Sequence, residues 1–275
     1  MIIRNVKDFN VRHIIECGQC FRWEKKGGGS YDIAAMHRRL NVNCQEGVLT
    51  LSCSLGEFEE IWRDYFDLDR DYSAIKAKIS SGDPVMARAV DHGWGIRILK
   101  QDLWETIVAF IISQNNNISR IKGCMERLCG SFGDPLVGFS GEEEGTLTRD
   151  IPRPDVLAGL TVDDLAPVRL GYRAEYLIRA SRQIMERGLP RDRKQLLALT
   201  GVGPKVASCI ELFGMGNMKS FPIDVWVRRL MHEFYGLDEK DGKAMEAFAR
   251  DRFGSFGGIA QQYLFYYERE KKNVQ

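Results

Sequence analysis

The chain has 275 residues, of which 44% are hydrophobic, so it is long and apolar enough for one large domain or two modest ones, each with a real core. Its formal net charge is only +1, and it has neither an apolar run of membrane-spanning length nor a charged-then-apolar leader. We therefore expect a globular intracellular protein with no membrane partner and a monomeric state by default.

The first distinctive segment is ECGQCFRW, residues 16–23. Cys17 and Cys20 have the spacing of metal ligands, but no second pair follows at a zinc-site distance, so we expect no metal here. The chain holds seven cysteines, an odd number, and in an intracellular protein such thiols are expected to stay reduced.

Residues 21–52 alternate between apolar and polar side chains in short runs, as around Leu40 and Val42. The runs break at residues 27–29, which are all glycine, and at residues 46–47, Glu-Gly. Period-two alternation bounded by turn residues is typical of strands. We predict an antiparallel sheet over this stretch.

A helix is predicted to follow the sheet. Ser54 and Glu57 have the spacing of a capping box, in which two side chains satisfy free backbone N–H groups at a helix start. The apolar residues behind them have helical spacing and form one stripe that we expect to cover the sheet. The stripe consists of Phe58, Ile61, Trp62 and Tyr65.

From Asp102 onward nearly every segment is typical of helix, with a first apolar stripe around Ile107 and Phe110. Two later runs stop at Gly188 and before Gly254, where glycine favours a helix end. Residues 133–154 are rich in Gly, Pro and acidic side chains, so we expect a surface loop there. The organisation predicts an α+β protein with a sheet domain over residues 1–92 and a helical domain over residues 93–275.

The segment LTGVGPKVASCI, residues 199–210, has two helical halves around a Gly-Val-Gly turn. Gly201 and Gly203 suit a tight turn, and Pro204 suits the first position of a helix. Backbone N–H groups of such a turn can bind a phosphate. Lys205 then lies in the first helical turn, where the macrodipole disfavours an ammonium ion and so favours a nucleophilic amine. The alternative is a solvent-facing lysine at a helix start.

The segment FPIDVWVRRL, residues 221–230, places Asp224 just before an amphipathic run. This aspartate is a candidate helix N-cap. It is also a candidate carboxylate near Lys205, where it would stabilise positive charge that develops on a sugar as a glycosidic bond breaks.

The order of these features, a hairpin, a lysine, a short apolar helix and then Pro-x-Asp, resembles that of the helix-hairpin-helix DNA glycosylases. The bifunctional members of that family use this lysine as nucleophile and this aspartate as its electrostatic partner. Four further segments look like those of the 8-oxoguanine DNA glycosylase/lyase family and occur in the same order. They are ECGQCFRW, ISQNNNISRI, RLGYRAEY and AQQYLF. The resemblance implies a TATA-binding-protein-like sheet domain packed on an all-α helix-hairpin-helix glycosylase domain. It also implies damaged double-stranded DNA as substrate and no cofactor. The expected location is then the cytoplasm or nucleoid of a prokaryote or the nucleus of a eukaryote.

Such an enzyme takes its target base out of the stack, reads it in a pocket and fills the hole. The resemblance assigns contacts with the base opposite the lesion to Asn115, Arg120 and Arg173, and places Tyr172 beside the opened pair. Asparagine and arginine donors suit the O2 and N3 acceptors of cytosine, so we expect a preference for cytosine there. The residues alone leave two other interpretations open, a capping turn over residues 115–117 and a core position for Tyr172.

For the lesion pocket, Cys209 and Phe213 follow the lysine by four and eight positions, and Gln261 and Phe265 are four apart on the last helix. The resemblance implies that Cys209 and Phe265 sandwich the purine and that Gln261 binds its Watson–Crick edge. It implies that the Gly18 carbonyl accepts from N7–H of 8-oxoguanine, where guanine has a lone pair. Taken singly, these residues are also compatible with an ordinary core and an ordinary turn.

Two positions depart from the family pattern. Trp226 stands where animal members carry histidine, which affects a contact to the lesion's phosphate, and Phe213 stands where they carry methionine, which alters the shape of the pocket. Three alternatives remain: a related glycosylase for oxidised pyrimidines or mismatched adenine, a non-catalytic DNA-binding module, and an architectural protein that bends DNA. The missing four-cysteine cluster motif, and the presence of Gly18, Asn115 and Gln261, weigh against the first.

Overall fold

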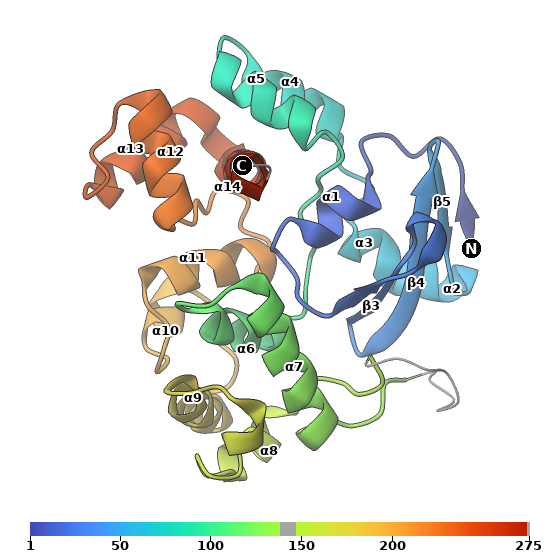
Figure 1. The fold of residues 1–275 in the computed structure, drawn as a ribbon, viewed down its shortest axis with the longest axis vertical. Coiled ribbons are helices and arrows are strands. Elements are labelled where there is room, and N and C mark those ends of the chain that lie inside the picture. The colour runs from blue at the N-terminus through green and yellow to red at the C-terminus, as the bar shows by residue number, and fades with distance from the viewer. Residues whose placement is uncertain (138–146, 274–275) are drawn as a thin grey trace.

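The computed structural model describes residues 1–137 and 147–273. Within them, five strands form one antiparallel sheet in the order β1-β5-β4-β3-β2, seen on the right in Figure 1. The strands are β1 (Ile2–Ile3), β2 (Trp23–Lys25), β3 (Tyr31–Ala35), β4 (Arg38–Gln45) and β5 (Val48–Leu51). The predicted antiparallel sheet is therefore confirmed, and β1 adds an edge strand that the alternation did not indicate.

Two-residue turns set the register of the sheet. Met36 and His37 join β3 to β4, and Glu46 and Gly47 join β4 to β5, all with positive φ. Two consecutive left-handed residues give the turn whose twist matches that of the flanking strands. The turn at residues 46–47 was predicted, whereas that at residues 36–37 has no glycine or asparagine to mark it. Glycines 27–29 form a short 3-10 turn, η1 (Gly27–Gly29), between β2 and β3.

Helices cover one face of the sheet, as the apolar stripe predicts. They are α1 (Val11–Glu16) and a continuous segment made of α2 (Leu55–Glu57), η2 (Phe58–Trp62) and α3 (Arg63–Tyr65). Phe58 and Trp62 share a core cluster with Leu40 of β4. Only half of the predicted capping box forms: the Ser54 side chain accepts from the Glu57 N–H, but the Glu57 carboxylate accepts from Trp62 Nε1 at 2.8 Å instead of reaching back.

The second part of the protein is helical, and its helices α9 and α13 end at Gly188 and Gly254 as predicted. The elements are α4 (Tyr72–Ser80), α5 (Pro84–His92), α6 (Leu103–Ser113), α7 (Ile118–Phe132), α8 (Pro154–Gly159), η3 (Ala166–Val168), α9 (Arg173–Arg187), α10 (Arg193–Leu197), α11 (Pro204–Phe213), α12 (Val225–Tyr235), α13 (Gly242–Phe253), η4 (Gly254–Phe256) and α14 (Gly257–Asn273).

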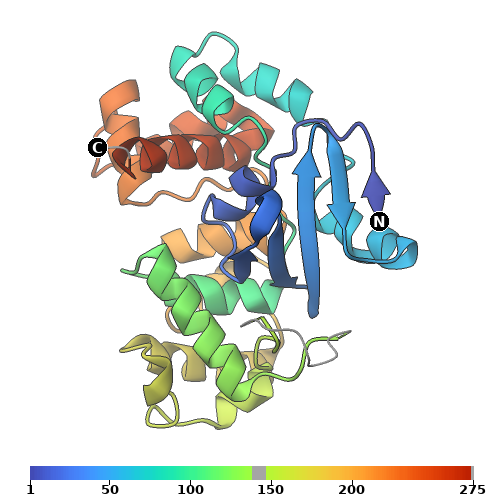
Figure 2. The ribbon, with the colours of Figure 1, turned by 45° about the vertical axis from the view of Figure 1, so that its right-hand side comes forward.

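These helices form two groups around a shared core. Helices α6 to α11 pack together, and α14 packs against α5 and α12 in the second group. Figure 2 shows α14 from the side, beneath α4 and α5. Helix α6 of the first group is buried along almost its whole length. In the described residues, no helix combines the length and apolarity that crossing a membrane requires.

Packing crosses the predicted division at residue 92. Tyr72 of α4 and Met86 of α5 belong to the helical core, whereas Leu99 packs with the sheet. The division itself stays a prediction. The predicted surface loop at residues 133–154 is anchored at its described ends, because Leu136 and Leu147 are buried against Ala34 of β3; residues 138–146 lie outside the described residues.

Candidate active site

A groove of about 980 Å³ lies where the two helical groups and the α1–β2 loop meet. A smaller recess of about 40 Å³ lies beside it. Five residues line both cavities: Gly18, Phe110, Lys205, Asp224 and Phe265. The recess is therefore continuous with the groove wall, and its remaining lining includes Cys209, Phe213 and Gln261.

Lys205 reaches this recess from the first turn of α11. Gly203 is the N-cap of this helix and Pro204 its first residue, as the sequence predicts. The Lys205 side chain is partly buried, and its Nζ lies 5.5 Å from the centre of the Phe110 ring. The lysine thus lines the recess beside an aromatic wall.

Asp224 faces Lys205 across the recess and also caps α12. Its Oδ1 accepts from the Val227 N–H at 2.8 Å. Burial raises the pKa of this carboxyl, while the Val227 N–H and the positive charge of Lys205 act in the opposite direction. The capping interpretation is confirmed, and the same side chain is placed to act on charge that develops near Lys205.

Aromatic and thiol side chains form the walls of the recess. Phe213 stacks on Phe110 with ring centres 5.4 Å apart and planes 11° apart. Cys209 is buried one helical turn after Lys205, and burial raises the pKa of its thiol against a smaller opposing effect of Lys205. The thiol is therefore neutral near pH 7 and presents an apolar, polarizable surface.

The last helix contributes a buried amide. Gln261 is only 4% exposed, and among the described residues its Oε1 has no hydrogen-bond partner. Phe265 lies one turn further along α14 and is partly buried. Buried amide oxygens are normally satisfied, so an unpartnered one that lines a recess indicates a place for a ligand donor.

Gly18 presents its backbone to the same cavity from the loop after α1. Its φ is +86°, and a Cβ there would lie 3.3 Å from Phe265 Cε1 and 3.2 Å from Arg269 Nη1. Glycine is required both by the left-handed conformation and by this close approach.

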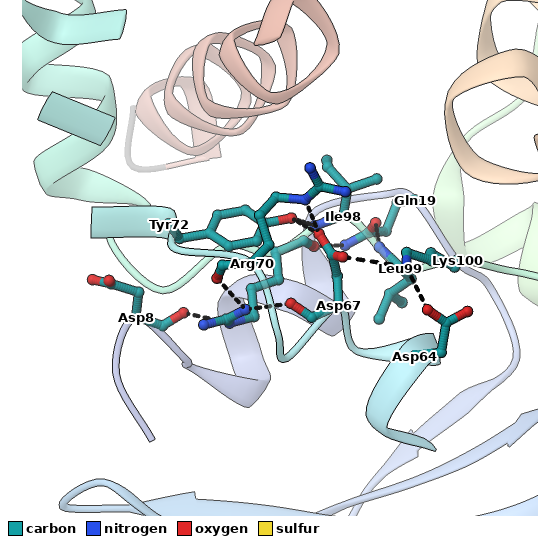
Figure 3. A network of polar contacts seen from close by, with 10 residues as sticks. Asp8, Gln19, Asp64, Asp67, Arg70, Tyr72, Ile98, Leu99 and Lys100 are labelled. Carbon is teal, nitrogen blue, oxygen red and sulfur yellow. Dashed lines mark hydrogen bonds and ion pairs between the residues drawn. The ribbon is translucent and has the colours of Figure 1, made fainter. Parts of the chain in front are cut away.

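The neighbouring residue, Gln19, anchors this loop. Its side chain is fully buried, accepts from the Leu99 N–H at 2.9 Å and donates to the Arg97 carbonyl at 2.8 Å. Figure 3 shows Gln19 and Leu99 beside a polar network around Asp67. Buried, fully paired polar groups hold a loop in one conformation.

The carbonyl of Gly18 is left free by this arrangement. Among the described residues, no hydrogen bond reaches it, although the carbonyls around it are bound. The donors are Arg269 to the carbonyl of Glu16, Gln262 to that of Cys17, and Gln101 to that of Gln19.

The residues expected on the DNA side lie at the α6–α7 turn and the start of α9. Asn115, with φ +47°, and Tyr172 are both exposed, and Asn115 Nδ2 donates to the Tyr172 hydroxyl at 3.3 Å. Asn117 caps α7 by accepting from the Arg120 N–H, so a capping turn is present, but Asn115 projects outside it. The core alternative for Tyr172 is wrong, since its side chain is 49% exposed.

Arg173 differs from the other residues on this side because it is buried. Its Nε and Nη2 donate to the carbonyl of Gln114, Nη2 also donates to that of Asn115, and Nη1 donates to that of Leu170 at 3.1 Å. Arg120, in contrast, is exposed. Most Arg173 donors hold the α6–α7 turn in place, which leaves one N–H on Nη1 for another partner.

The hairpin before α11 is held against α9. Gly201 has φ +84°, and a Cβ there would lie 2.8 Å from the Tyr176 side chain. Its carbonyl accepts from Gln114 Nε2 at 2.9 Å, which ties the hairpin to the α6–α7 turn. Gly203 is exposed at the helix start, where free N–H groups can meet an anion.

Sequence reasoning did not assign several residues that line the cavities, among them Phe110, Trp23 and Arg269. Phe110 belongs to the apolar stripe predicted for its helix and lines both cavities, whereas Trp23 and Arg269 line the groove. No local signal distinguishes such residues, because only the packing of distant segments brings them to the wall of a cavity. Cys17 and Cys20 are buried free thiols, and the described residues contain no cluster of three or more His, Cys, Asp or Glu that could hold a metal ion.

Two family models match the chain. Residues 1–107 match the 8-oxoguanine DNA glycosylase N-terminal domain, and residues 108–254 match the HhH-GPD superfamily of base excision DNA repair proteins. The N-glycosylase/DNA lyase of Saccharomyces cerevisiae is 33% identical over 269 residues, covering 85% of this chain and 70% of the yeast protein.

Solved structures agree in fold over nearly the whole chain. The 8-oxoguanine glycosylase/lyase of Clostridium acetobutylicum, in complex with double-stranded DNA containing cytosine opposite 8-oxoguanine, is 37% identical with a TM-score of 0.91 and covers 98% of this chain and 95% of that one. The structure of MBOgg1 with a low-affinity DNA ligand is 40% identical, also with a TM-score of 0.91, and covers 98% and 96%.

Proposed function

Because this chain belongs to the 8-oxoguanine DNA glycosylase family of helix-hairpin-helix base excision repair enzymes, which are glycosylase/lyases, we propose that it excises 8-oxoguanine from duplex DNA and then cleaves the strand. The observation that carries this proposal is the recess itself. It joins a lysine, a carboxylate, an unpartnered amide oxygen and a glycine backbone from four separate segments. A DNA-binding module or an architectural protein has no need of such a recess.

Lys205 is the proposed nucleophile. Its neutral amine attacks C1′ of the flipped nucleotide, the C1′–N9 bond breaks, and the base leaves with the bonding electrons and takes up a proton. The nitrogen then loses a proton, and its lone pair forms the C1′=N bond as the C1′–O4′ bond breaks. O4′ keeps the electrons of that bond and takes up a proton, which leaves a protonated Schiff base. Removal of a C2′ proton expels the 3′ phosphate by β-elimination. These steps need no cofactor.

Asp224 is the proposed electrostatic partner of this step. Positive charge develops at C1′ while the base departs, and a carboxylate in a partly buried recess stabilises that charge more than it would in water. Its hydrogen bond to the Val227 N–H fixes the carboxylate before DNA binds. Such preorganisation avoids a reorganisation cost during the reaction.

The base is read by groups on three sides. We assign the Gly18 carbonyl to N7–H, Gln261 to the Watson–Crick edge, and the two faces of the purine to Cys209 and Phe265, with Phe213 closing the end of the pocket. A recess of about 40 Å³ holds little more than a few waters. Entry of a purine therefore requires the Phe265 ring to move away from Cys209.

Contacts with the rest of the duplex are assigned to the exposed α6–α7 and hairpin surfaces. Asn115 and Arg120 face the base opposite the lesion, Tyr172 wedges beside it, and the remaining N–H of Arg173 completes the donors that suit cytosine. The N–H groups around Gly201 and Gly203 bind a backbone phosphate. The substrate is thus a double-stranded DNA that presents cytosine opposite 8-oxoguanine.

Borohydride trapping tests the nucleophile directly, because reduction of the Schiff base leaves a stable protein–DNA complex. We expect trapping of the native protein on an 8-oxoguanine:cytosine duplex and none with Lys205→Gln. Lys219→Gln, on an exposed loop, is the matched control and should trap like the native protein. Trapping of Lys205→Gln at the native level would exclude this nucleophile, and an intact strand on a denaturing gel would exclude the lyase step.

A further inference from the structure

Arg269 lines the groove next to the recess, one helical turn after Phe265 on α14. Its side chain is 14% exposed, and its guanidinium carbon lies 5.6 Å from the centre of the Phe265 ring. Nη2 donates to the Glu16 carbonyl at 2.6 Å and pairs with the Glu270 carboxylate at 3.3 Å. One side of the guanidinium is therefore fixed.

The other side of this guanidinium has no acceptor. Among the described residues, Nη1 is buried without a hydrogen-bond partner. It lies against Gly18, since a Cβ built there would be 3.2 Å from it. A buried cationic N–H without an acceptor is costly, so its persistence at a cavity lining indicates a ligand acceptor.

Gly18 and Arg269 together present an acceptor and a donor at one place. The Gly18 carbonyl is free of hydrogen bonds in the described structure, and Nη1 of Arg269, which lies against Gly18, is a donor without a partner. The imidazole side of 8-oxoguanine carries N7–H and C8=O next to each other, in the arrangement of a cis amide. Guanine has a lone pair and a C–H at these positions and can satisfy neither group.

We propose that Arg269 is a further specificity-determining residue, whose Nη1–H donates to O8 of the everted base while the Gly18 carbonyl accepts from N7–H. The proposal rests on the excision of 8-oxoguanine proposed above. The protein then recognises the oxidised edge of the base with one acceptor, the Gly18 carbonyl, and one donor, Nη1 of Arg269. The fixed Nη2 contact holds the free N–H in place, so little side-chain entropy is lost when the base enters.

A purely positioning role is the competing explanation, because loss of the Arg269 contact to the Glu16 carbonyl could loosen the Gly18 loop. The two roles differ in their dependence on the acceptor at C8. 8-Thioguanine keeps N7–H but replaces O8 with sulfur, which is a weak acceptor. If Arg269 contacts O8 directly, its loss slows excision of 8-oxoguanine strongly and excision of 8-thioguanine much less. A loosened loop impairs both substrates alike.

The experiment measures single-turnover base excision on both lesions opposite cytosine, with cleavage of a preformed abasic site as a measure of intact folding. Arg269→Met keeps the aliphatic stem but removes the donors. We expect it to slow excision of 8-oxoguanine by about 10- to 100-fold, as for loss of a hydrogen bond to a charged donor, and abasic-site cleavage by less than about twofold. The native preference for 8-oxoguanine over 8-thioguanine should shrink by a similar factor.

Arg12→Met is the matched control, because Arg12 also contacts Glu16 and Glu270 but does not line the groove. It should resemble the native protein on every substrate. Equal losses of Arg269→Met on both lesions, or no loss, would overturn the O8 contact and leave the proposed function standing. If the native protein excised neither lesion, the proposed function would fall, and this inference with it.

Discussion

The Asp224 carboxylate accepts from the Val227 N–H at 2.8 Å, so one side chain both begins helix α12 and lines the recess that holds Lys205. These two roles can be separated, because a cap needs only a hydrogen-bond acceptor whereas charge stabilisation needs a carboxylate.

Asp224→Asn should keep the helix cap and lose most of the excision activity. We expect its unfolding free energy to stay within about 0.5 kcal/mol of the native value, since asparagine caps as well as aspartate, whereas Asp224→Ala loses about 1 kcal/mol. Both variants should excise 8-oxoguanine about 100-fold or more slowly, the usual cost of removing a preorganised electrostatic group. Urea unfolding and single-turnover excision provide the two measurements.

The matched pair for this test is Asp241→Asn and Asp241→Ala, because Asp241 caps α13 in the same way, through the Ala244 N–H, and does not line the recess. Its variants should show the same pattern of stability with native excision rates. Native-like excision by Asp224→Asn would mean that the carboxylate only caps its helix.

Gly18→Ala should impair base removal and spare strand cleavage. The left-handed φ of +86° disfavours alanine, and the added Cβ would lie 3.3 Å from Phe265 Cε1, so the carbonyl must shift. We expect excision of 8-oxoguanine to fall by about 10-fold or more, as when a buried hydrogen bond is misplaced, while a preformed abasic site is cleaved normally.

Gly28→Ala controls for backbone strain in this test, since Gly28 also has positive φ but would place its Cβ in open space. It should lose a little stability and no activity. If Gly18→Ala behaved in the same way, the Gly18 carbonyl would not read the base.

Stability should depend on pH through Glu105 of α6. Burial raises the pKa of Glu105 from 4.5 to about 7, and Arg22 opposes the shift. The folded protein therefore holds this proton more tightly than the unfolded chain does. The resulting stabilisation is complete below about pH 4.5 and is lost as the pH rises through about 7.

Glu105→Gln isolates this contribution, because glutamine does not titrate. Between pH 5 and pH 8, the native protein should lose about 2 to 3 kcal/mol of unfolding free energy relative to the variant. Urea unfolding at several pH values measures the difference, with the exposed Glu246→Gln as control. A difference between the native protein and Glu105→Gln that is constant across pH would contradict the prediction.

The native protein should prefer cytosine opposite the lesion. Excision of 8-oxoguanine should be faster opposite cytosine than opposite adenine. Asn115→Ala should lower the ratio of these two rates by about 10-fold, a common cost of losing a base-edge contact. Asn217→Ala, on an exposed loop outside the groove, should leave it unchanged. Equal native rates opposite the two bases would show that this surface does not read the partner base.

The amino-acid sequence determined features that depend on near neighbours along the chain. Pro204 begins α11, Gly188 and Gly254 end their helices, and Asp224 caps α12, because each effect acts within one helical turn. The antiparallel sheet followed from alternation in the same local way. The resemblance to a family then supplied candidate roles for residues far apart in the chain.

Only the tertiary structure decided what these residues face. It brings Gly18, Lys205 and Gln261 to one recess, makes the buried Phe110 part of the recess wall, and buries Arg173 beneath the α6–α7 turn. It also leaves Nη1 of Arg269 without an acceptor beside Gly18. Such facts arise when distant segments pack and exclude water together, and no pattern of neighbouring residues encodes which polar atoms that packing leaves free.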